Sequence, residues 1–228
     1  MHIPDGFIDA GTSLGAGMVA AGGIGVAARK TAAALDDRGV PLAGLVAAFV
    51  FAVQMLNFPV AAGTSGHLLG GVLAAVLVGP WAGALCIAVV LGVQALFADG
   101  GITALGLNVL NMALVGGLGG YALFLALRKL TGGRRTAIPV VAGVAAGLSV
   151  VLAAGAFTVE YALGGVGGAS VGAVAAAMTS VHALIGIGEG LITAATVATV
   201  LAVRPDLVHG ARHEAQLDLR PVDVAVGR

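Results

Sequence analysis

Charged side chains are scarce in this sequence. Of its 228 residues 10% are charged, whereas 59% are apolar and the mean hydropathy is +1.05. A soluble domain of this length carries about a quarter charged residues, and its helices keep polar faces that most of these segments lack. The composition excludes a soluble globular domain and predicts an all-α fold, a polytopic bundle of transmembrane helices.

Cysteine and N-terminal basic residues are also nearly missing. The single cysteine, Cys86, lies in an apolar run, which excludes a disulfide framework and a thiolate metal cluster. The first residues include Asp5 and Asp9 and lack the basic start of a secretory signal peptide. We therefore expect the native N-terminus to be retained, with the bulky His2 obstructing removal of Met1.

Long apolar runs are abundant instead. A spanning helix needs about 20 mostly apolar residues. Gly79-Pro80 separates a short third run from the fourth, so these two form either a tight hairpin or one broken element. We expect six or seven helices in a single domain over residues 1–204, followed by a polar cytoplasmic tail over residues 205–228. The expected segments are 11–28, 41–57, 67–79, 81–97, 104–127, 137–158 and 172–203.

The basic residues are segregated along the chain. With seven helices and the N-terminus outside, all eleven lie on the cytoplasmic side, as the positive-inside rule requires. We therefore expect a multi-pass protein of the cell membrane with a cytoplasmic C-terminus. The opposite loops carry only acids, which would concentrate cations there, although the rule for bases explains their placement equally well. The bases are Arg29, Lys30, Arg38, Arg128, Lys129, Arg134, Arg135, Arg204, Arg212, Arg220 and Arg228, and the acids are Asp5, Asp9, Asp99 and Glu160.

The opening residues Met1-His2-Ile3-Pro4-Asp5-Gly6 contain a chelating arrangement. The free α-amine, the peptide nitrogen that joins Met1 to His2 and the His2 imidazole can close on one metal ion in fused rings. One more nitrogen would complete a planar four-nitrogen site, which suits Ni(II) or Cu(II) and is compatible with Co(II). In a polytopic membrane protein this start predicts metal uptake.

His67 is the candidate for the fourth nitrogen. It lies in Gly63-Thr64-Ser65-Gly66-His67, where a flexible polar loop meets a helix on the predicted outer side. The glycines allow one stretch of backbone to approach another closely, as a chain terminus dipping into a bundle requires. Taken alone, a histidine at a helix end more commonly faces water.

Several other polar residues lie in or beside the apolar segments. His182 and Glu189 are seven residues apart and share a face of the last helix. Burying an ionisable side chain in the membrane costs free energy, so such residues usually indicate a function. We expect them to line the cavity, to orient a ligand or to bond to a neighbouring helix. Asp5 and Asp99 are candidates for fixing a ligand imidazole, although Pro4-Asp5-Gly6 equally supports a simple turn at Asp5. The remaining cavity or bundle-interior candidates are Asn57, Ser65, Gln94, Asn108, Asn111 and Gln54.

Together these motifs make the chain resemble a known family. Met1-His2-Ile3-Pro4-Asp5-Gly6, the segment around His67, and His182 through Gly190 are similar to the CbiM/NikM family. Members of that family are the substrate-binding membrane (S) components of energy-coupling-factor nickel and cobalt transporters, an ABC type of permease. The resemblance runs from Met1 to about Val203. It implies that Met1, His2 and His67 bind the transported Ni(II) or Co(II).

The resemblance also implies partners. A metal-capture subunit of this kind works in the membrane with a transmembrane coupling (T) subunit and two ATP-binding-cassette ATPases, and no nucleic acid is involved. The sequence has no P-loop, so ATP hydrolysis must come from another chain, and any small accessory membrane subunit is separate. We expect a transporter component with no catalytic residues and no catalytic cofactor. Residue types leave nickel versus cobalt open.

Two alternatives come from other classes of protein. A rhomboid-like intramembrane serine protease would use Ser65 of Gly63-Thr64-Ser65-Gly66 as nucleophile and His182 as base. Its G-x-S-G pattern is weak in a chain with 38 glycines, and it leaves the N-terminal chelate without a role. A stand-alone channel or carrier for small solutes is the second alternative, because many glycines and few charges are compatible with it.

Overall fold

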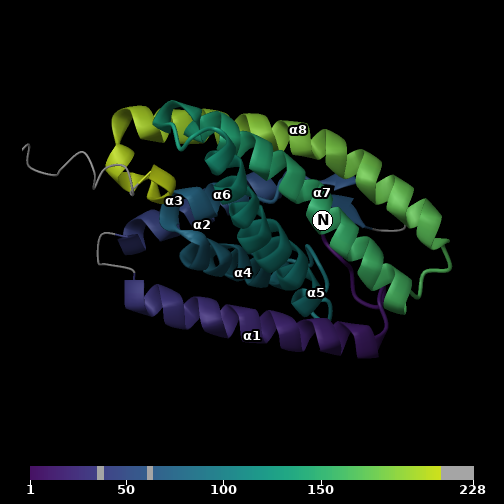
Figure 1. Ribbon diagram of the computed structural model, residues 1–228. Coiled ribbons are helices and arrows are strands. Elements are labelled where there is room, and N and C mark those ends of the chain that lie inside the picture. Colours follow the sequence, from purple (N-terminus) through teal and green to yellow (C-terminus); the bar gives the residue numbers. More distant parts are fainter. Residues whose placement is uncertain (35–38, 61–63, 212–228) are drawn as a thin grey trace, which may run out of the picture.

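The computed structural model describes residues 1–34, 39–60 and 64–211. Within these ranges seven helices run back and forth along one long axis, with α1 and α8 on opposite sides of the bundle (Figure 1). The expected all-α polytopic bundle of six to seven helices is confirmed. The predictions for Arg38, for Gly63 and for the tail from residue 212 onward fall outside the described residues.

The helices differ widely in length. Leu105–Leu130 is one continuous helix that contains a π-helical stretch, Leu110–Gly119. Four helices are long and apolar enough to cross a membrane: Ala10–Ala34, Leu105–Leu130, Arg135–Gly164 and Val171–Val203. The elements are α1 (Ala10–Ala34), α2 (Gly39–Gln54), β1 (Phe58–Pro59), β2 (Ser65–Gly66), α3 (Gly71–Val78), α4 (Pro80–Leu96), α5 (Leu105–Val109), α6 (Gly120–Leu130), α7 (Ile138–Gly164) and α8 (Val171–Val203).

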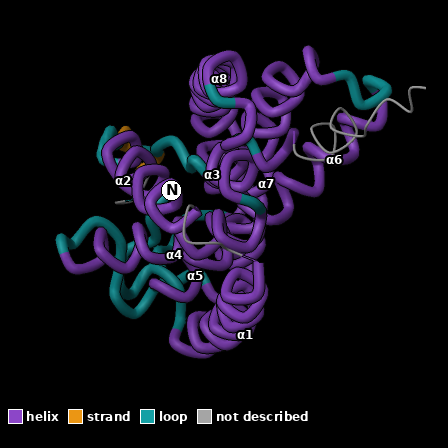
Figure 2. The backbone as a smooth tube through the Cα atoms, turned by 90° about the vertical axis from the view of Figure 1, so that its left-hand side faces the viewer, coloured by secondary structure: helices purple, strands orange, loops and turns teal. Residues whose placement is uncertain are grey.

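Helices α3 and α4 form a tight hairpin, the first of the two arrangements that Gly79-Pro80 allowed. Gly79 makes the turn at φ 92° and ψ 155°, a left-handed conformation that suits glycine. Beyond the turn, a Cβ on Gly83 would lie 2.7 Å from the backbone nitrogen of Ala75. All eight residues of α3 are buried, and the helix lies among the other helices in the view along the bundle (Figure 2).

Two details differ from the sequence-based expectation. The third segment was predicted to begin at residue 67, but α3 begins at Gly71, and His67 lies in the non-helical stretch before it. Glu160 was assigned to an outer loop, but α7 continues to Gly164 and buries it. The carboxylate of Glu160 accepts a hydrogen bond from Asn111 Nδ2 at 2.7 Å, so a polar pair is satisfied between two helices.

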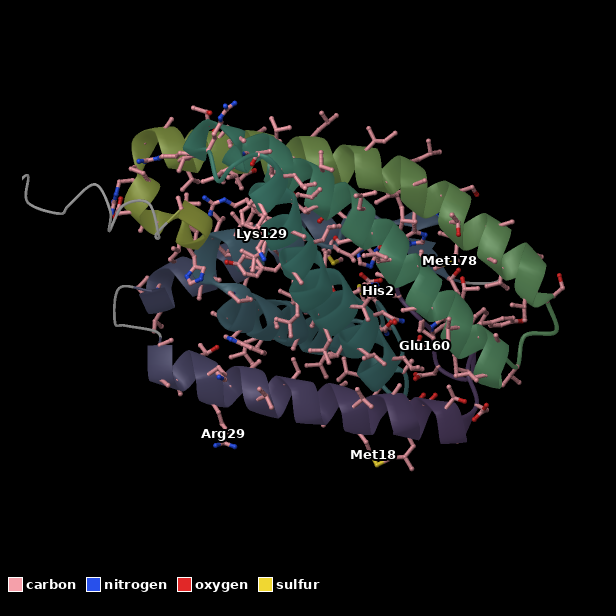
Figure 3. The ribbon with its side chains drawn as sticks, in the orientation of Figure 1. His2, Met18, Arg29, Lys129, Glu160 and Met178 are labelled. Carbon is pink, nitrogen blue, oxygen red and sulfur yellow. The ribbon has the colours of Figure 1, made fainter. Side chains whose placement is uncertain are left out.

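The described basic residues gather toward one end of the bundle. Arg29 and Lys129 lie in that half, whereas His2, Glu160 and Met178 lie in the other half (Figure 3). The loops of the second half, residues 1–9, 55–60, 64–70, 97–104 and 165–170, contain no Lys or Arg. This distribution agrees with the predicted topology, while the orientation in the membrane stays a prediction.

The first residues after α8 pack back onto the bundle. Two short 3-10 turns, Pro205–Leu207 and His209–Ala211, follow the helix. Val208 is fully buried, and Arg128 Nη1 donates a hydrogen bond to the carbonyl oxygen of Gly210 at 2.6 Å. Residues 205–211 therefore cover the basic end of α3 and α6.

The close approach in the hairpin predicts different tolerances for two glycines of α4. We expect Gly83→Ala to lower the free energy of unfolding by about 1–3 kcal/mol, because the new methyl group would meet the backbone of α3. Gly92→Ala is the matched control, because nothing lies within 4 Å of its added Cβ. Thermal unfolding of both variants in detergent measures the difference, and equal midpoints would contradict the hairpin packing.

Candidate metal site

The N-terminal segment, residues 1–9, enters the bundle instead of ending at its surface. Met1, His2 and Ile3 are only 1%, 4% and 0% exposed, and the chain start lies within the bundle (Figure 1). Isolated β-bridges pair His2 with Ser65 and Ile8 with Gly165. A chain terminus and its main-chain polar groups are therefore buried among the helices.

Asn108 and Gly101 bind the main chain of this segment. The N–H of Ile3 donates to Asn108 Oδ1 at 2.8 Å, and Asn108 Nδ2 donates back to the Ile3 carbonyl at 3.2 Å. The N–H of Gly101 donates to the same carbonyl at 2.9 Å. These partners replace the water that the main-chain groups lose on burial. A buried amide group without any hydrogen-bond partner would lower the stability of the fold.

The imidazoles of His2 and His67 meet at the buried terminus. Their ring centroids lie 4.3 Å apart with the planes tilted by 36°, although the two residues are far apart in the sequence. His67 is completely buried, so it does not face water as an isolated helix-end histidine commonly does. The structure thus brings together the three sequence candidates Met1, His2 and His67.

The tautomer of His67 follows from its hydrogen bond. Its Nδ1 lies 2.7 Å from the carbonyl oxygen of Leu68, and because a carbonyl only accepts, Nδ1 carries the proton and donates it. The other ring nitrogen, Nε2, then has a free lone pair, and it is buried without a hydrogen-bond partner in the described part of the chain. A neutral imidazole fixed in this way is ready to bind a metal through Nε2.

The ring of His2 is fixed by Asp99. Its Nδ1 donates to Asp99 Oδ1 at 2.8 Å, and Asn57 Nδ2 donates to the second carboxylate oxygen at 3.1 Å. A six-membered chelate with the His2 main-chain nitrogen uses Nδ1, because Nε2 is too far along the ring. In the structure, therefore, the nitrogen that the predicted chelate needs, His2 Nδ1, is hydrogen-bonded to Asp99. Its Nε2 has no hydrogen-bond partner among the described residues.

Burial decides the charges around the terminus. It lowers the pKa of the Met1 amine well below its ordinary value, against the opposing influence of Asp99 and Glu189. Burial also lowers the pKa of His2 despite the hydrogen bond to Asp99. Burial would raise the pKa of Asp99, but the hydrogen bond from His2 helps to outweigh it, so this pKa lies below its ordinary value. The result is a pair of neutral nitrogen donors beside an ionised carboxylate.

The remaining loop candidates surround these three residues. Asp5 Oδ1 accepts hydrogen bonds from the N–H of Thr103 at 2.7 Å and from its hydroxyl at 2.5 Å. Ser65 is the β-bridge partner of His2. Gln94 is fully buried, and its side chain lies close to His2.

His182 and Glu189 approach the same region from α8. His182 Nδ1 donates to the Met178 carbonyl at 2.8 Å, and its Nε2 has no hydrogen-bond partner within residues 1–34, 39–60 and 64–211. Neither nitrogen is therefore bonded to Ser65, so the dyad of the protease alternative is not formed. Glu189 accepts hydrogen bonds from the main-chain N–H groups of Leu69 and Gly70, both at 2.7 Å.

Three of the residues that position the terminus were not predicted to do so from the sequence. Asn108 was expected inside the bundle, but its pairing with the Ile3 main chain was not anticipated. Thr103 and Gly101 are a threonine and a glycine in a loop, types with many ordinary uses. Among the described residues, no three His, Cys, Asp or Glu side chains are placed to hold one metal ion.

An open hollow of about 380 Å³ lies over the site. Its wall includes side chains of the terminus and of the loop after α4, so the surroundings of His2 connect with the exterior at the end that lacks basic residues. The lining residues are His2, Pro4, Asp5, Ser65, Ala95, Ala98, Asp99, Gly100, Gly101 and Ile102.

Fold and site together define a multi-pass helical membrane protein that buries its chain terminus beside two imidazoles. The family model described as "Cobalt uptake substrate-specific transmembrane region" (CbiM) matches residues 2–207. The chain belongs to this family, as the resemblance of its motifs indicated.

Relatives carry names of both nickel and cobalt transport. The "Putative fused nickel transport protein NikMN" of Archaeoglobus fulgidus is 42% identical over 91% of this chain and 68% of that protein. The "Fused nickel transport protein NikMN" of Rhodobacter capsulatus is 44% identical over 54% of this chain and 36% of its own length. The "Cobalt transport protein CbiM" of Sorangium cellulosum is 47% identical over 39% of this chain and 40% of its own length.

Solved structures support the fold. One titled "Crystal Structure of an transition metal transporter" is 29% identical, with a TM-score of 0.84 over 97% of this chain and 100% of that chain. A truncated transition metal transporter is 30% identical, with a TM-score of 0.83 over 89% of this chain and 99% of that chain.

The contacts of Asn108 predict that it controls exposure of the chain terminus. We expect Asn108→Leu to raise the rate at which an amine-reactive reagent labels Met1 by roughly thirtyfold, because two hydrogen bonds worth about 1 kcal/mol each are lost. Mass spectrometry of the N-terminal peptide measures the rate, with Lys30 and Lys129 as internal references. Asn111→Leu is the control, because Asn111 binds Glu160 and not the terminus. Equal labelling in both variants would argue against the role of Asn108.

Proposed function

We propose that this chain is the substrate-capture subunit of a nickel or cobalt uptake system of the energy-coupling-factor type. The observation that carries the proposal is the meeting of His2 and His67, with ring centroids 4.3 Å apart, at a buried chain terminus. Membership of the CbiM family and the names of its nickel and cobalt relatives support the same function.

The donor set of the proposed site consists of four nitrogens. The Met1 amine and the main-chain nitrogen of His2 form a five-membered chelate ring with the metal, and that nitrogen and His2 Nδ1 form a six-membered one. His67 Nε2, which is buried and unpartnered, is the fourth donor. Such a set suits Ni(II) and Co(II) and disfavours Mg²⁺ and Ca²⁺, which prefer six or more oxygen ligands.

When the metal binds, His2 Nδ1 exchanges its hydrogen bond to Asp99 for a bond to the metal. The ring turns about its Cβ–Cγ bond, Nδ1 leaves Asp99 and binds the metal, and its proton moves to Nε2. The main-chain nitrogen of His2 must also lose its proton, which the metal displaces. Asp99 keeps its hydrogen bond from Asn57 and stays beside the site as a negative charge.

Transport requires partners in this proposal. We infer that metal enters through the hollow at the end without basic residues, which lies outside the cell, and that the basic end faces the cytoplasm. A transmembrane coupling subunit and two ATPases would drive release by moving the whole subunit, which would pull the terminus from its pocket.

The chain spans 36% to 68% of the lengths of the three relatives named above, two of which are fused proteins.

Changes at the chain start test the proposal. An acetyl group on the Met1 amine, or His2→Ala, removes a chelate ring, and we expect either change to weaken Ni(II) and Co(II) binding at least about a hundredfold. Equilibrium competition with a chromophoric chelator measures the affinity of the purified protein. One residue added at the C-terminus is the control, which should bind like the unaltered chain. A channel or carrier that ignores the chelate would be indifferent to all three changes.

The donor set also predicts how binding depends on pH. The Met1 amine is held neutral by burial, so the main-chain N–H of His2 is the main source of a released proton near neutral pH. We expect about one proton to be released per metal ion, so that affinity rises about tenfold per pH unit and falls as the pH drops. Uptake of metal in weakly buffered solution with a pH indicator measures the release. Binding without any release would exclude a main-chain nitrogen donor.

A further inference from the structure

We propose that Glu189 is a positioning residue that acts on His67 through a single peptide bond. The inference rests on the proposed function and extends it, because it assigns to a carboxylate of α8 the control of the fourth metal donor. The segment concerned is the stretch His67–Gly70, which has no regular secondary structure and leads into α3.

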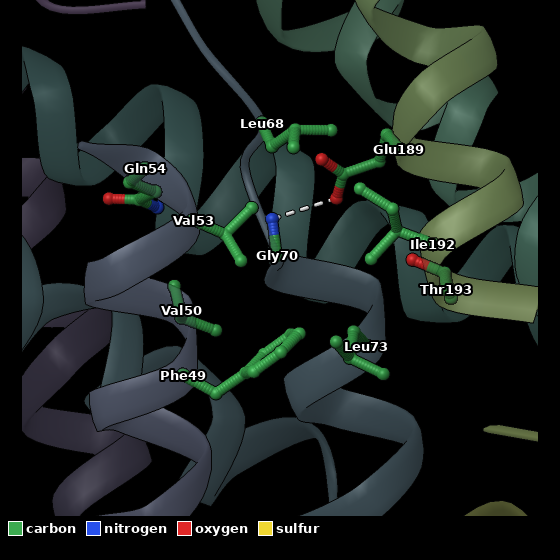
Figure 4. Close-up of a pocket in the computed structure, with 10 residues that line it drawn as sticks. All are labelled: Phe49, Val50, Val53, Gln54, Leu68, Gly70, Leu73, Glu189, Ile192 and Thr193. Carbon is green, nitrogen blue, oxygen red and sulfur yellow. Dashed lines mark hydrogen bonds between the residues drawn. The ribbon is translucent and has the colours of Figure 1, made fainter. Parts of the chain in front are cut away.

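Both oxygens of Glu189 bind this segment. The N–H of Leu69 donates to Oε2 and the N–H of Gly70 donates to Oε1, each at 2.7 Å. Figure 4 shows the carboxylate reaching across from α8 to the N–H of Gly70. Glu189 is only 2% exposed, so these hydrogen bonds lie away from water, where contacts with a carboxylate are strong.

One peptide group connects the carboxylate with the imidazole. The Leu68 carbonyl and the Leu69 N–H belong to the same planar peptide, so their directions are fixed relative to each other. The N–H end of that peptide donates to Glu189, and its carbonyl end accepts from His67 Nδ1 at 2.7 Å. Glu189, the peptide and His67 thus form a continuous chain of hydrogen bonds.

Such a chain has two physical effects. It fixes the plane and the tautomer of His67, so that Nε2 always carries the free lone pair. It also polarises the peptide, because hydrogen bonds in series strengthen one another, and this makes Nε2 a better donor to a metal. Carboxylates that bind a ligand histidine directly act in the same way, and here a peptide group lies between them.

A second anchor holds the segment from the opposite side. Gln54, at the end of α2, donates from Nε2 to the Leu69 carbonyl at 2.6 Å. This bond steadies the next peptide and does not touch the one that binds His67. Gln54 and Glu189 therefore separate two effects, since both hold the segment in place but only Glu189 polarises the peptide next to His67.

The experiment is a double-mutant cycle on the full-length chain with an unmodified N-terminus. Affinities for Ni(II) and Co(II) are measured for the unaltered chain, Glu189→Gln, His67→Ala and the double variant, together with the visible spectrum of each complex. Glu160→Gln is the matched control, because Glu160 is a buried glutamate of α7 that binds Asn111. The unfolding temperature of each metal-free variant reports any general loss of stability.

We expect Glu189→Gln to weaken metal binding roughly tenfold to a hundredfold and to shift the spectrum, the usual range for a group that supports a ligand. Glu160→Gln should change the affinity less than about twofold, below the effect of losing one hydrogen bond. In the His67→Ala background, Glu189→Gln should have no further effect. Equal losses in both backgrounds would mean that Glu189 only stabilises the fold, and an unchanged affinity would overturn the inference directly.

Gln54→Met provides the second variant if Glu189→Gln does not fold. It removes the donor to Leu69 while keeping a side chain of similar size, and we expect it to weaken binding about fivefold, the effect of one hydrogen bond, with an unshifted spectrum. A spectral shift as large as that of Glu189→Gln, or a loss that persists without His67, would overturn the proposal. If the unaltered chain itself binds neither metal tightly, the proposed function fails, and this inference fails with it.

Discussion

A chain terminus that lies inside a membrane bundle must find a partner for every main-chain group that it buries. Met1, His2 and Ile3 are almost completely enclosed, in surroundings where an unsatisfied amide is expensive. Asn108 and Gly101 bind the main chain of Ile3, and an isolated β-bridge pairs His2 with Ser65. The proposed metal donors are close together because the backbone that carries them is held by hydrogen bonds.

The same requirement governs the polar side chains deeper in the bundle. Glu160 is paired with Asn111, and Glu189 takes up two N–H groups that precede α3. The atoms without partners include one nitrogen each of His2, His67 and His182. Within the described residues, a densely hydrogen-bonded interior thus keeps lone pairs free around the buried terminus. The buried carboxylates are therefore taken up in hydrogen bonds that hold the fold, while the neighbouring histidines each keep one nitrogen without a partner.

Much of the fold was predictable from the sequence, because apolar runs and the distribution of bases report helices and their connections directly. The site was predictable only in part. His2 and His67 were paired by their chemistry, and the structure places them together. The hydrogen bond of His2 Nδ1 to Asp99 was not foreseen, since it depends on how two loops meet. The start of α3 was misplaced, because the N–H groups of Leu69 and Gly70 bind Glu189 of α8, a long-range contact that the local apolar pattern does not report.

The buried hairpin has a consequence for biogenesis. An eight-residue helix is far shorter than the hydrocarbon layer, so α3 cannot insert as a span by itself. The acceptor for the N–H groups that precede α3 belongs to α8, which is synthesised after all the other described membrane helices. Until that helix arrives, Leu69 and Gly70 lack the carboxylate that they bind in the finished protein. The pocket is therefore completed only after synthesis of the whole bundle, and a chain arrested before α8 contains both imidazoles without their final arrangement.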